Sequence, residues 1–214
     1  MNGRGPDRRL LICVAAAWLA APPLALAAPS DAAASADDMA MGSPKARVTV
    51  IEYASAACPH CARFNINVFP AFKKKYVDTG KVRYVYREFL TEPVAVAAAG
   101  ALLARCAGKA RYFDVLDDFF HGQTQAYETG DVRGLIYAVG KKAGLTEAKI
   151  DACLSDEAAA KALNARVQRY SETEGVDSTP TFVINGRKLA GLNHEVALAD
   201  LDAAIGPLLE RRRR

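Results

Sequence analysis

Two cysteines two positions apart, Cys58 and Cys61, are the residues with the clearest capacity for chemistry, and they enclose Pro59 and His60. Such a pair is typical of half a zinc site, of a structural disulfide or of a reactive dithiol. A zinc site needs four ligands, commonly from two close pairs, and the other candidate ligands are isolated from one another. They are Cys106, His121, Cys153 and His194. A bridge within the pair would close a tiny loop and constrain little chain entropy. The spacing therefore favours a reactive dithiol.

The elements around the pair decide what its first sulfur can do. Residues 46–55 have the β-branched and aromatic content of a buried strand, and a helical pattern begins at Pro59. At a helix N-terminus, unpaired backbone N–H groups and the positive dipole end stabilise an anion. Proline suits the first helical position, and His60 adds positive charge. We expect the Cys58 thiol to have a pKa well below about 8.5, which makes its disulfide oxidising.

The helix after the pair leads into a second strand. Its apolar positions recur at helical spacing, and Pro70 within it predicts a kink because proline cannot donate to the carbonyl of Ile66. The helix is expected to end near Gly80, followed by a strand over 81–89. Residues 46–89 therefore predict one βαβ unit with parallel strands and a right-handed connection.

The rest of the chain is first helical and then returns to strands. Residues 92–173 form alanine-rich, helix-periodic blocks separated by glycines. Two short apolar runs over 179–191 flank Asn185–Gly186, the strongest short-range signal for a β-hairpin. A final helix is expected over 194–210, with Asn193 as its N-cap.

The order βαβ, helices, ββα is that of an α/β protein with the thioredoxin fold, interrupted by an all-helical domain. We expect the thioredoxin-like domain to comprise residues 45–90 and 174–210, with the helical insertion at 91–173. Residues 28–44 are small and polar and predict a flexible leader. Residues 211–214 form a basic tail.

Residues 1–27 have the layout of a signal peptide. A basic start precedes an apolar run of twelve residues, and small residues up to Ala27 provide a cleavage site. Arg8–Arg9 leaves a twin-arginine export signal open, and an uncleaved anchor is the other alternative. The sequence thus predicts export to the periplasm, with cleavage near Ala27.

Cleavage would change both the cysteine count and the charge. It would remove Cys13, three arginines and one aspartate, which leaves four cysteines and lowers the formal net charge from +4 to +2. An even number of cysteines suits an oxidising compartment. Four of the remaining positive charges are the terminal arginines, so the body is nearly neutral and offers no basic surface for nucleic acid.

The segment VIEYASAACPHCARF resembles the active-site segment of the DsbA-like thiol:disulfide oxidoreductases, an exported branch of the thioredoxin superfamily. The resemblance covers about residues 46–210. It implies that Cys58 is the exposed nucleophile and Cys61 its buried resolving partner. It further implies that Thr179–Pro180 is a cis peptide that lies against the dithiol and, with Pro59, contacts substrate. The residues alone leave a trans turn open, because cis is only about 5–6% of X–Pro bonds.

Glu52 is an acid in an otherwise apolar strand, six residues before Cys58. It either points to solvent at a strand edge or is the buried acid that lies under the disulfide in the family it resembles. A buried carboxyl group could relay protons to or from Cys61. Arg83 is a candidate counter-charge on the neighbouring strand, with Lys81 and Arg87 as competitors.

Cys106 and Cys153 both fall in the helical insertion. Free cysteines buried in alanine-rich helices are common and inert, whereas an oxidising compartment favours a bridge between two helices. We expect the bridge, which departs from the many family members that have only the active-site pair.

The resemblance and the dithiol together predict an exported enzyme, a thiol:disulfide oxidoreductase that most resembles an oxidase. Its substrates would be unfolded or cysteine-containing exported proteins, and a membrane partner of the DsbB type would reoxidise it. It would need no metal and no cofactor beyond the Cys58–Cys61 disulfide. A reductase or isomerase stays open, because threonine before the proline also occurs in isomerases. A chaperone or metal-delivery module without enzymatic activity is the third alternative.

Overall fold

The computed structural model describes residues 1–2, 35, 37–189 and 195–210. Apart from Met1 and Asn2, the predicted signal peptide lies outside the described residues, as do Asn193, His194 and the basic tail at 211–214. Among the helices of the described ranges, none combines the length and the apolar composition needed to cross a bilayer.

A mixed five-stranded sheet in the order β1-β3-β2-β4-β5 forms the centre of the fold. Its two longest strands, β2 (Val48–Ala54) and β3 (Val82–Glu88), are parallel neighbours, as the predicted βαβ unit requires. The remaining neighbours pair antiparallel. This confirms the predicted α/β class and thioredoxin fold.

The first strand, β1 (Met39–Met41), corrects the prediction of a flexible leader that extends to residue 44. It pairs antiparallel with β3, with Met39 opposite Tyr86. Asp38, just before it, is buried and receives two hydrogen bonds from Arg87, at 3.1 and 3.0 Å. The buried ion pair and the strand pairing fix this segment to the sheet.

The helix after the dithiol is divided rather than kinked. It consists of α1 (Pro59–Asn67), α2 (Phe69–Phe72) and a π-helical turn, η1 (Lys73–Val77). Pro70 lies in the first turn of α2, where its missing N–H is tolerated. The prediction of one kinked helix was wrong because proline here begins a new helical segment.

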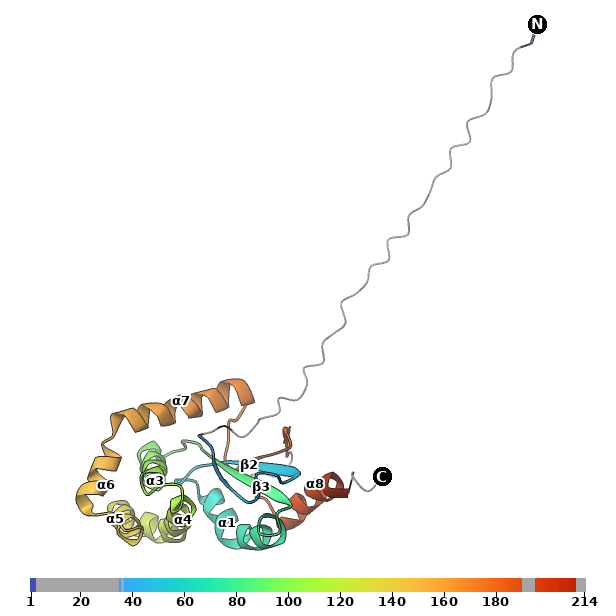
Figure 1. Cartoon of the computed structure of the whole chain (residues 1–214). Coiled ribbons are helices and arrows are strands. Elements are labelled where there is room, and N and C mark those ends of the chain that lie inside the picture. Colours follow the sequence, from blue (N-terminus) through green and yellow to red (C-terminus); the bar gives the residue numbers. More distant parts are fainter. Residues whose placement is uncertain (3–34, 36, 190–194, 211–214) are drawn as a thin grey trace.

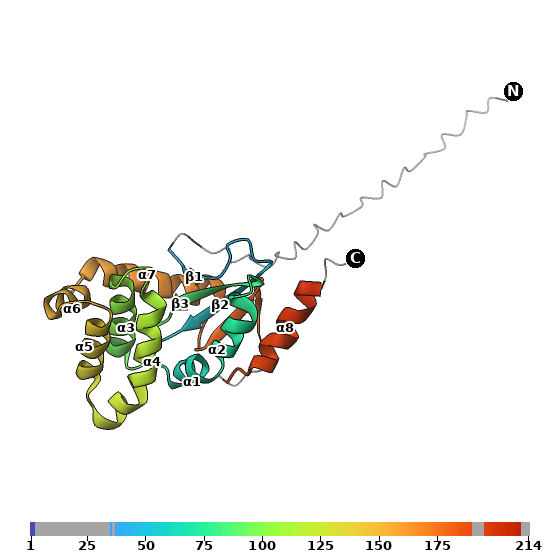
Figure 2. The same cartoon turned by 60° about the horizontal axis from the view of Figure 1, so that its bottom comes forward.

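Five helices follow β3 in the chain before the next strand. Figures 1 and 2 show α3 to α6 grouped beside the sheet, with α4 next to α1. Helix α7 packs on the face of the sheet opposite to α1. Their bounds are α3 (Val94–Cys106), α4 (Tyr112–Thr129), α5 (Val132–Lys142), α6 (Glu147–Leu154) and α7 (Glu157–Glu174).

The predicted hairpin is present as β4 (Thr181–Ile184) and β5 (Arg187–Lys188). Asn185 and Gly186 both have positive φ, 45° and 78°, as a type I′ turn requires. The last helix, α8 (Leu198–Glu210), begins later than the predicted 194. The carboxylate of Asp200 accepts a hydrogen bond from the backbone N–H of Ala197 and so satisfies a donor at this later start.

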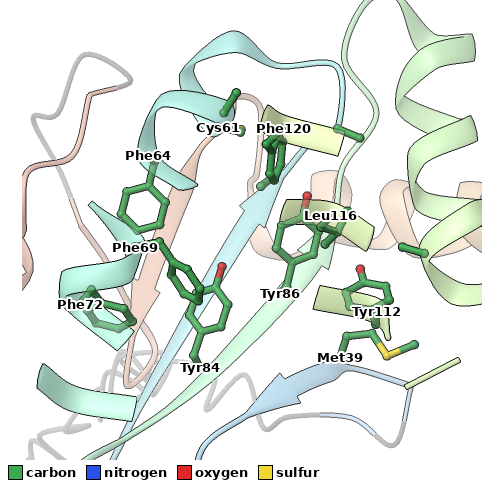
Figure 3. Close-up of a cluster of buried hydrophobic side chains, with 14 of the residues drawn as sticks. Met39, Cys61, Phe64, Phe69, Phe72, Tyr84, Tyr86, Tyr112, Leu116 and Phe120 are labelled. Carbon is green, nitrogen blue, oxygen red and sulfur yellow. The ribbon is translucent and has the colours of Figure 1, made fainter. Parts of the chain in front are cut away.

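The alternation of side chains along β2 separates two packed faces. Val48 and Val50 face α1, α2 and α8, where aromatic residues form most of the core. Ile51 and Tyr53 face α7 and pack with Tyr170. Glu52 therefore lies on the first of these faces, below α1. In Figure 3, Cys61 lies at one end of the core cluster there.

Candidate active site

The dithiol lies where β2 gives way to α1. Cys58 is the N-cap of α1 and Pro59 occupies the first helical position, as the sequence predicts. Cys61, one turn further, is fully buried, whereas 6% of the surface of Cys58 is exposed. Both are free thiols. The resemblance implied an exposed nucleophile, whereas Cys58 is nearly buried and the carbonyl oxygen of Thr179 lies 3.5 Å from its sulfur.

The two thiols have opposite acidities. Hydrogen bonds to the Cys58 sulfur lower the pKa of this thiol from its ordinary 9.0 to about 5, the largest contribution coming from the side chain of Cys61. Thr179 and the backbone N–H groups of Cys61 and His60 add to it against the opposing effect of burial. Burial above all, and then the charge and hydrogen bond of Cys58, raise the pKa of Cys61 well above its ordinary value. At pH 7 a pKa of about 5 gives a roughly hundredfold excess of thiolate over thiol at Cys58.

Thr179 and Pro180 meet the dithiol from the far end of the chain. Their peptide bond is cis. The Cys58 thiol lies 3.5 Å from the backbone carbonyl oxygen of Thr179, to which it donates when protonated. The Thr179 hydroxyl is buried and has no partner among the described residues other than the Cys58 sulfur. It is therefore available to donate to a sulfur anion.

Glu52 is 3% exposed and lies on the same face of the sheet as α1. Its carboxylate accepts a hydrogen bond from the Tyr84 hydroxyl. Burial raises the pKa of Glu52 from 4.5 to about 8, opposed by the Tyr84 hydrogen bond and reinforced by the negative charge of Cys58. The solvent-facing alternative is thus excluded.

Arg83, one of the three candidate counter-charges, does not pair with Glu52. In the parallel register Glu52 lies opposite Tyr86, and Arg83 lies opposite Thr49. Alternation along β3 places Tyr84 on the face of Glu52 and Arg83 on the other face. Among the described residues no cation forms a salt bridge with Glu52, whose side-chain partner is Tyr84; Arg87 pairs with Asp38 and Glu174 instead.

His60 lines a groove along α1. Its Nδ1 is 2.6 Å from Nη2 of Arg63, and the same guanidinium nitrogen lies 3.2 Å from a carboxylate oxygen of Glu195. The groove has a volume of about 170 Å³, and Phe64 and Val196 form part of its apolar wall. The groove follows α1, the helix whose N-cap is Cys58.

Two residues that the sequence reading missed, Gln123 and Tyr127 of α4, hold the loop ahead of Cys58. Gln123 donates to the carbonyl oxygen of Ala56 at 2.6 Å, and Tyr127 donates to that of Ala57 at 3.0 Å. The available signal was a glutamine at a core position of the apolar face of α4, where it is 1% exposed.

The other two cysteines of the described residues are joined. A disulfide links Cys106 at the end of α3 to Cys153 in α6, with the two Cα atoms 6.0 Å apart. No group of three or more histidine, cysteine, aspartate or glutamate side chains within the described ranges is placed to hold a metal ion.

Comparisons with known proteins agree with this geometry. The sequence model described as "Thioredoxin" matches residues 34–205. A Rickettsia bellii protein with the provisional name protein-disulfide oxidoreductase is 32% identical over 170 residues, which are 79% of this chain and 65% of that protein. The chain spans 55–65% of the length of the first five curated relatives that it matches.

Solved structures give the same picture. The structure of α-DsbA1 from Wolbachia pipientis has a TM-score of 0.75 and 26% identity, with 83% of this chain and 94% of that chain covered. The structure of a protein-disulfide isomerase from Novosphingobium aromaticivorans has a TM-score of 0.69 and 26% identity, with coverages of 81% and 97%.

Proposed function

The chain belongs to the thioredoxin family, and we propose that it is a DsbA-like thiol:disulfide oxidoreductase that oxidises cysteine-containing exported proteins. The observation that carries this proposal is the unequal dithiol. One sulfur lies at the N-terminus of α1 with its pKa lowered to about 5, and the other is buried with its pKa raised. A sulfur that is stable as an anion is a good leaving group in disulfide exchange.

The reaction begins with the Cys58–Cys61 disulfide. A substrate thiolate attacks the sulfur of Cys58, the bond to Cys61 breaks, and Cys61 leaves as a thiolate that takes up a proton. The carboxyl group of Glu52, whose pKa is raised by burial, is the proposed source of that proton. Cys58 is now joined to the substrate in a mixed disulfide.

A second substrate thiolate then attacks the substrate sulfur of the mixed disulfide. The new disulfide forms within the substrate, and Cys58 departs as a thiolate. The substrate loses two electrons and the protein gains them. Thr179, whose carbonyl oxygen lies against Cys58, and the adjacent Pro180 are proposed to guide the substrate backbone. A DsbB-type membrane partner is proposed to reoxidise the dithiol.

Export to the periplasm is part of the proposal. Residues 1–27 have the layout of a cleavable signal. The Cys106–Cys153 disulfide supports the same conclusion, because such bridges persist in oxidising compartments.

Isomerisation is the second candidate, and it is favoured by the similarity to the structure named as a protein-disulfide isomerase. The two activities are separated by mixing the oxidised protein with a reduced two-cysteine peptide and, separately, the reduced protein with scrambled ribonuclease. We expect rapid stoichiometric oxidation of the peptide, which Cys58→Ser abolishes, and little rescue of the ribonuclease. Efficient rescue without peptide oxidation would show that the protein is an isomerase. If neither activity is detected, the protein is a binding module without enzymatic activity.

A further inference from the structure

Three successive backbone carbonyls ahead of α1 accept hydrogen bonds from one helix of the insertion. The Gln123 amide donates to Ala56 at 2.6 Å and lies 3.5 Å from the carbonyl oxygen of Cys58. One turn further along α4, the Tyr127 hydroxyl donates to Ala57 at 3.0 Å. Residues four apart on a helix share one face, so α4 presents both donors to the loop together.

The loop has few hydrogen-bond partners of its own. The N–H of Cys58 donates to the Ser55 carbonyl at 3.0 Å, and that of Ala57 donates to the Ser55 hydroxyl at 3.2 Å. Ala56 and Ala57 are 3% and 1% exposed. Since a buried carbonyl that loses its partner costs about 1–3 kcal/mol, the donors on α4 favour this one loop shape.

The insertion also restricts the loop by close packing. A Cβ atom at Gly100 of α3 would lie 2.4 Å from the Cβ of Ala56, so α3 approaches the loop as closely as a glycine permits. Gln123 itself lies among the buried aromatic residues of α4 and has little freedom to move. The loop is thus held by two helices of the segment between β3 and β4.

We propose that Gln123 and Tyr127 are positioning residues of the dithiol. They hold residues 56–58 in the shape in which the first N–H groups of α1 and the Cys61 thiol face the Cys58 sulfur. The proposal rests on the proposed function, since it assigns to the helical insertion a part in keeping Cys58 an anion. Without these donors the loop gains freedom, and the thiolate loses part of its stabilisation.

The test uses two variants that remove donors with little change in volume, Tyr127→Phe and Gln123→Met. Two controls match them. Gln125→Met changes an exposed glutamine of the same helix, and Tyr137→Phe removes a hydroxyl that contacts Asp151 on α6. For each reduced protein, the Cys58 midpoint is measured by thiolate absorbance, and the dithiol is equilibrated with glutathione. Melting temperatures are recorded alongside.

We expect Tyr127→Phe and Gln123→Met each to raise the Cys58 midpoint and to shift the glutathione equilibrium about two- to tenfold away from the reduced protein, as expected for a lost hydrogen bond. The double variant should shift it further, and the controls should leave both readings unchanged. Unchanged midpoints in Tyr127→Phe and Gln123→Met, with only a lower melting temperature, would reduce the two residues to a packing role.

The readings also separate this inference from the proposed function. If the wild-type protein fails to oxidise a peptide but its Cys58 midpoint still responds to the two variants, the function is wrong and the positioning role stands. If the peptide is oxidised and the midpoint does not respond, the positioning role is wrong and the function stands. Should Gln123→Met fail to fold, Tyr127→Phe, which loses one oxygen atom, decides the matter.

Discussion

At the scale of single residues, three ionisable groups respond to one another across the base of α1. The negative charge of Cys58 raises the pKa of Cys61 and of Glu52, in both cases after the larger effect of burial. When Cys58 is tied up in a disulfide, that charge is absent. The protonation of Glu52 is therefore linked to the redox state of the dithiol.

This linkage predicts how the reduction potential varies with pH. Reduction of the disulfide between the pKa values of the two cysteines places one proton on Cys61. Because the Cys58 thiolate raises the pKa of Glu52, reduction also draws a second proton onto Glu52 at pH values between its lower, oxidised-state pKa and about 8. For a two-electron couple each proton contributes about 30 mV per pH unit.

The wild-type potential should therefore fall by more than about 30 mV, and by up to about 60 mV, per pH unit in that window. Glu52→Gln should fall by about 30 mV throughout. The potentials are measured by glutathione equilibration at a series of pH values. Equal slopes in the two proteins would mean that Glu52 does not take part, and Glu128→Gln, an exposed residue on α4, serves as the control.

At the scale of elements, the disulfide ties the insertion together. Cys106 and Cys153 are 47 residues apart, and on the chain-entropy model a bridge over such a loop contributes about 4 kcal/mol. The bridge joins α3, which packs against the active-site loop, to α6 in the outer part of the insertion.

Replacing both cysteines by alanine should thus lower the free energy of unfolding by up to about 4 kcal/mol. Chemical denaturation of the oxidised proteins measures it. Because the hydrogen bonds that hold the dithiol loop come from Gln123 and Tyr127 of α4, the Cys58 midpoint should stay near its wild-type value. A loss of stability below about 1 kcal/mol would contradict the structural role assigned to this bridge.

The elements that the sequence predicts best are those with a local signal. The strands around the dithiol, the helix start at Pro59 and the hairpin at Asn185–Gly186 all follow from residues within a few positions. The short strand β1 has no such signal, because it depends on the buried pair between Asp38 and Arg87, 49 residues apart. A three-residue segment shows too little periodicity to be identified.

Some residues of the candidate site also have a signal in the sequence, and others do not. Its two cysteines are evident from their spacing, and the resemblance implied that Thr179–Pro180 lies beside them. Alternation along β3 would have identified Tyr84 rather than Arg83 as the partner of Glu52, had the parallel register been known. Gln123 on the apolar face of α4 indicates a buried polar partner, but side-chain types do not reveal that the partners of Gln123 and Tyr127 are the backbone carbonyls of Ala56 and Ala57.

At the scale of the whole molecule, Arg87 of β3 connects distant segments of the chain. It donates to Asp38 ahead of β1 and, at 2.7 and 2.8 Å, to Tyr53 of β2 and Glu174 at the end of α7. Glu174 is five residues before Thr179, which lies against Cys58. The Arg87 guanidinium therefore holds both the segment ahead of β1, through Asp38, and the segment that leads to Thr179, through Glu174.

Replacing Arg87 by methionine should leave Asp38 and Glu174 without their cation. Removing one partner of a buried ion pair costs about 3–5 kcal/mol, so the free energy of unfolding should fall by that order. The matched control is Lys142→Met, which breaks a surface pair with Asp118 worth less than about 1 kcal/mol. Similar losses in the two variants, measured by denaturant titration, would show that the Arg87 network is not a major source of stability.

The central claim, that Cys58 is held as an anion at the start of α1, is tested most directly by titrating the thiolate absorbance of the reduced protein. The account predicts a midpoint near pH 5 that is absent in Cys58→Ser, with Cys61 remaining protonated well beyond neutral pH. A midpoint near the ordinary value of 9.0 would contradict it.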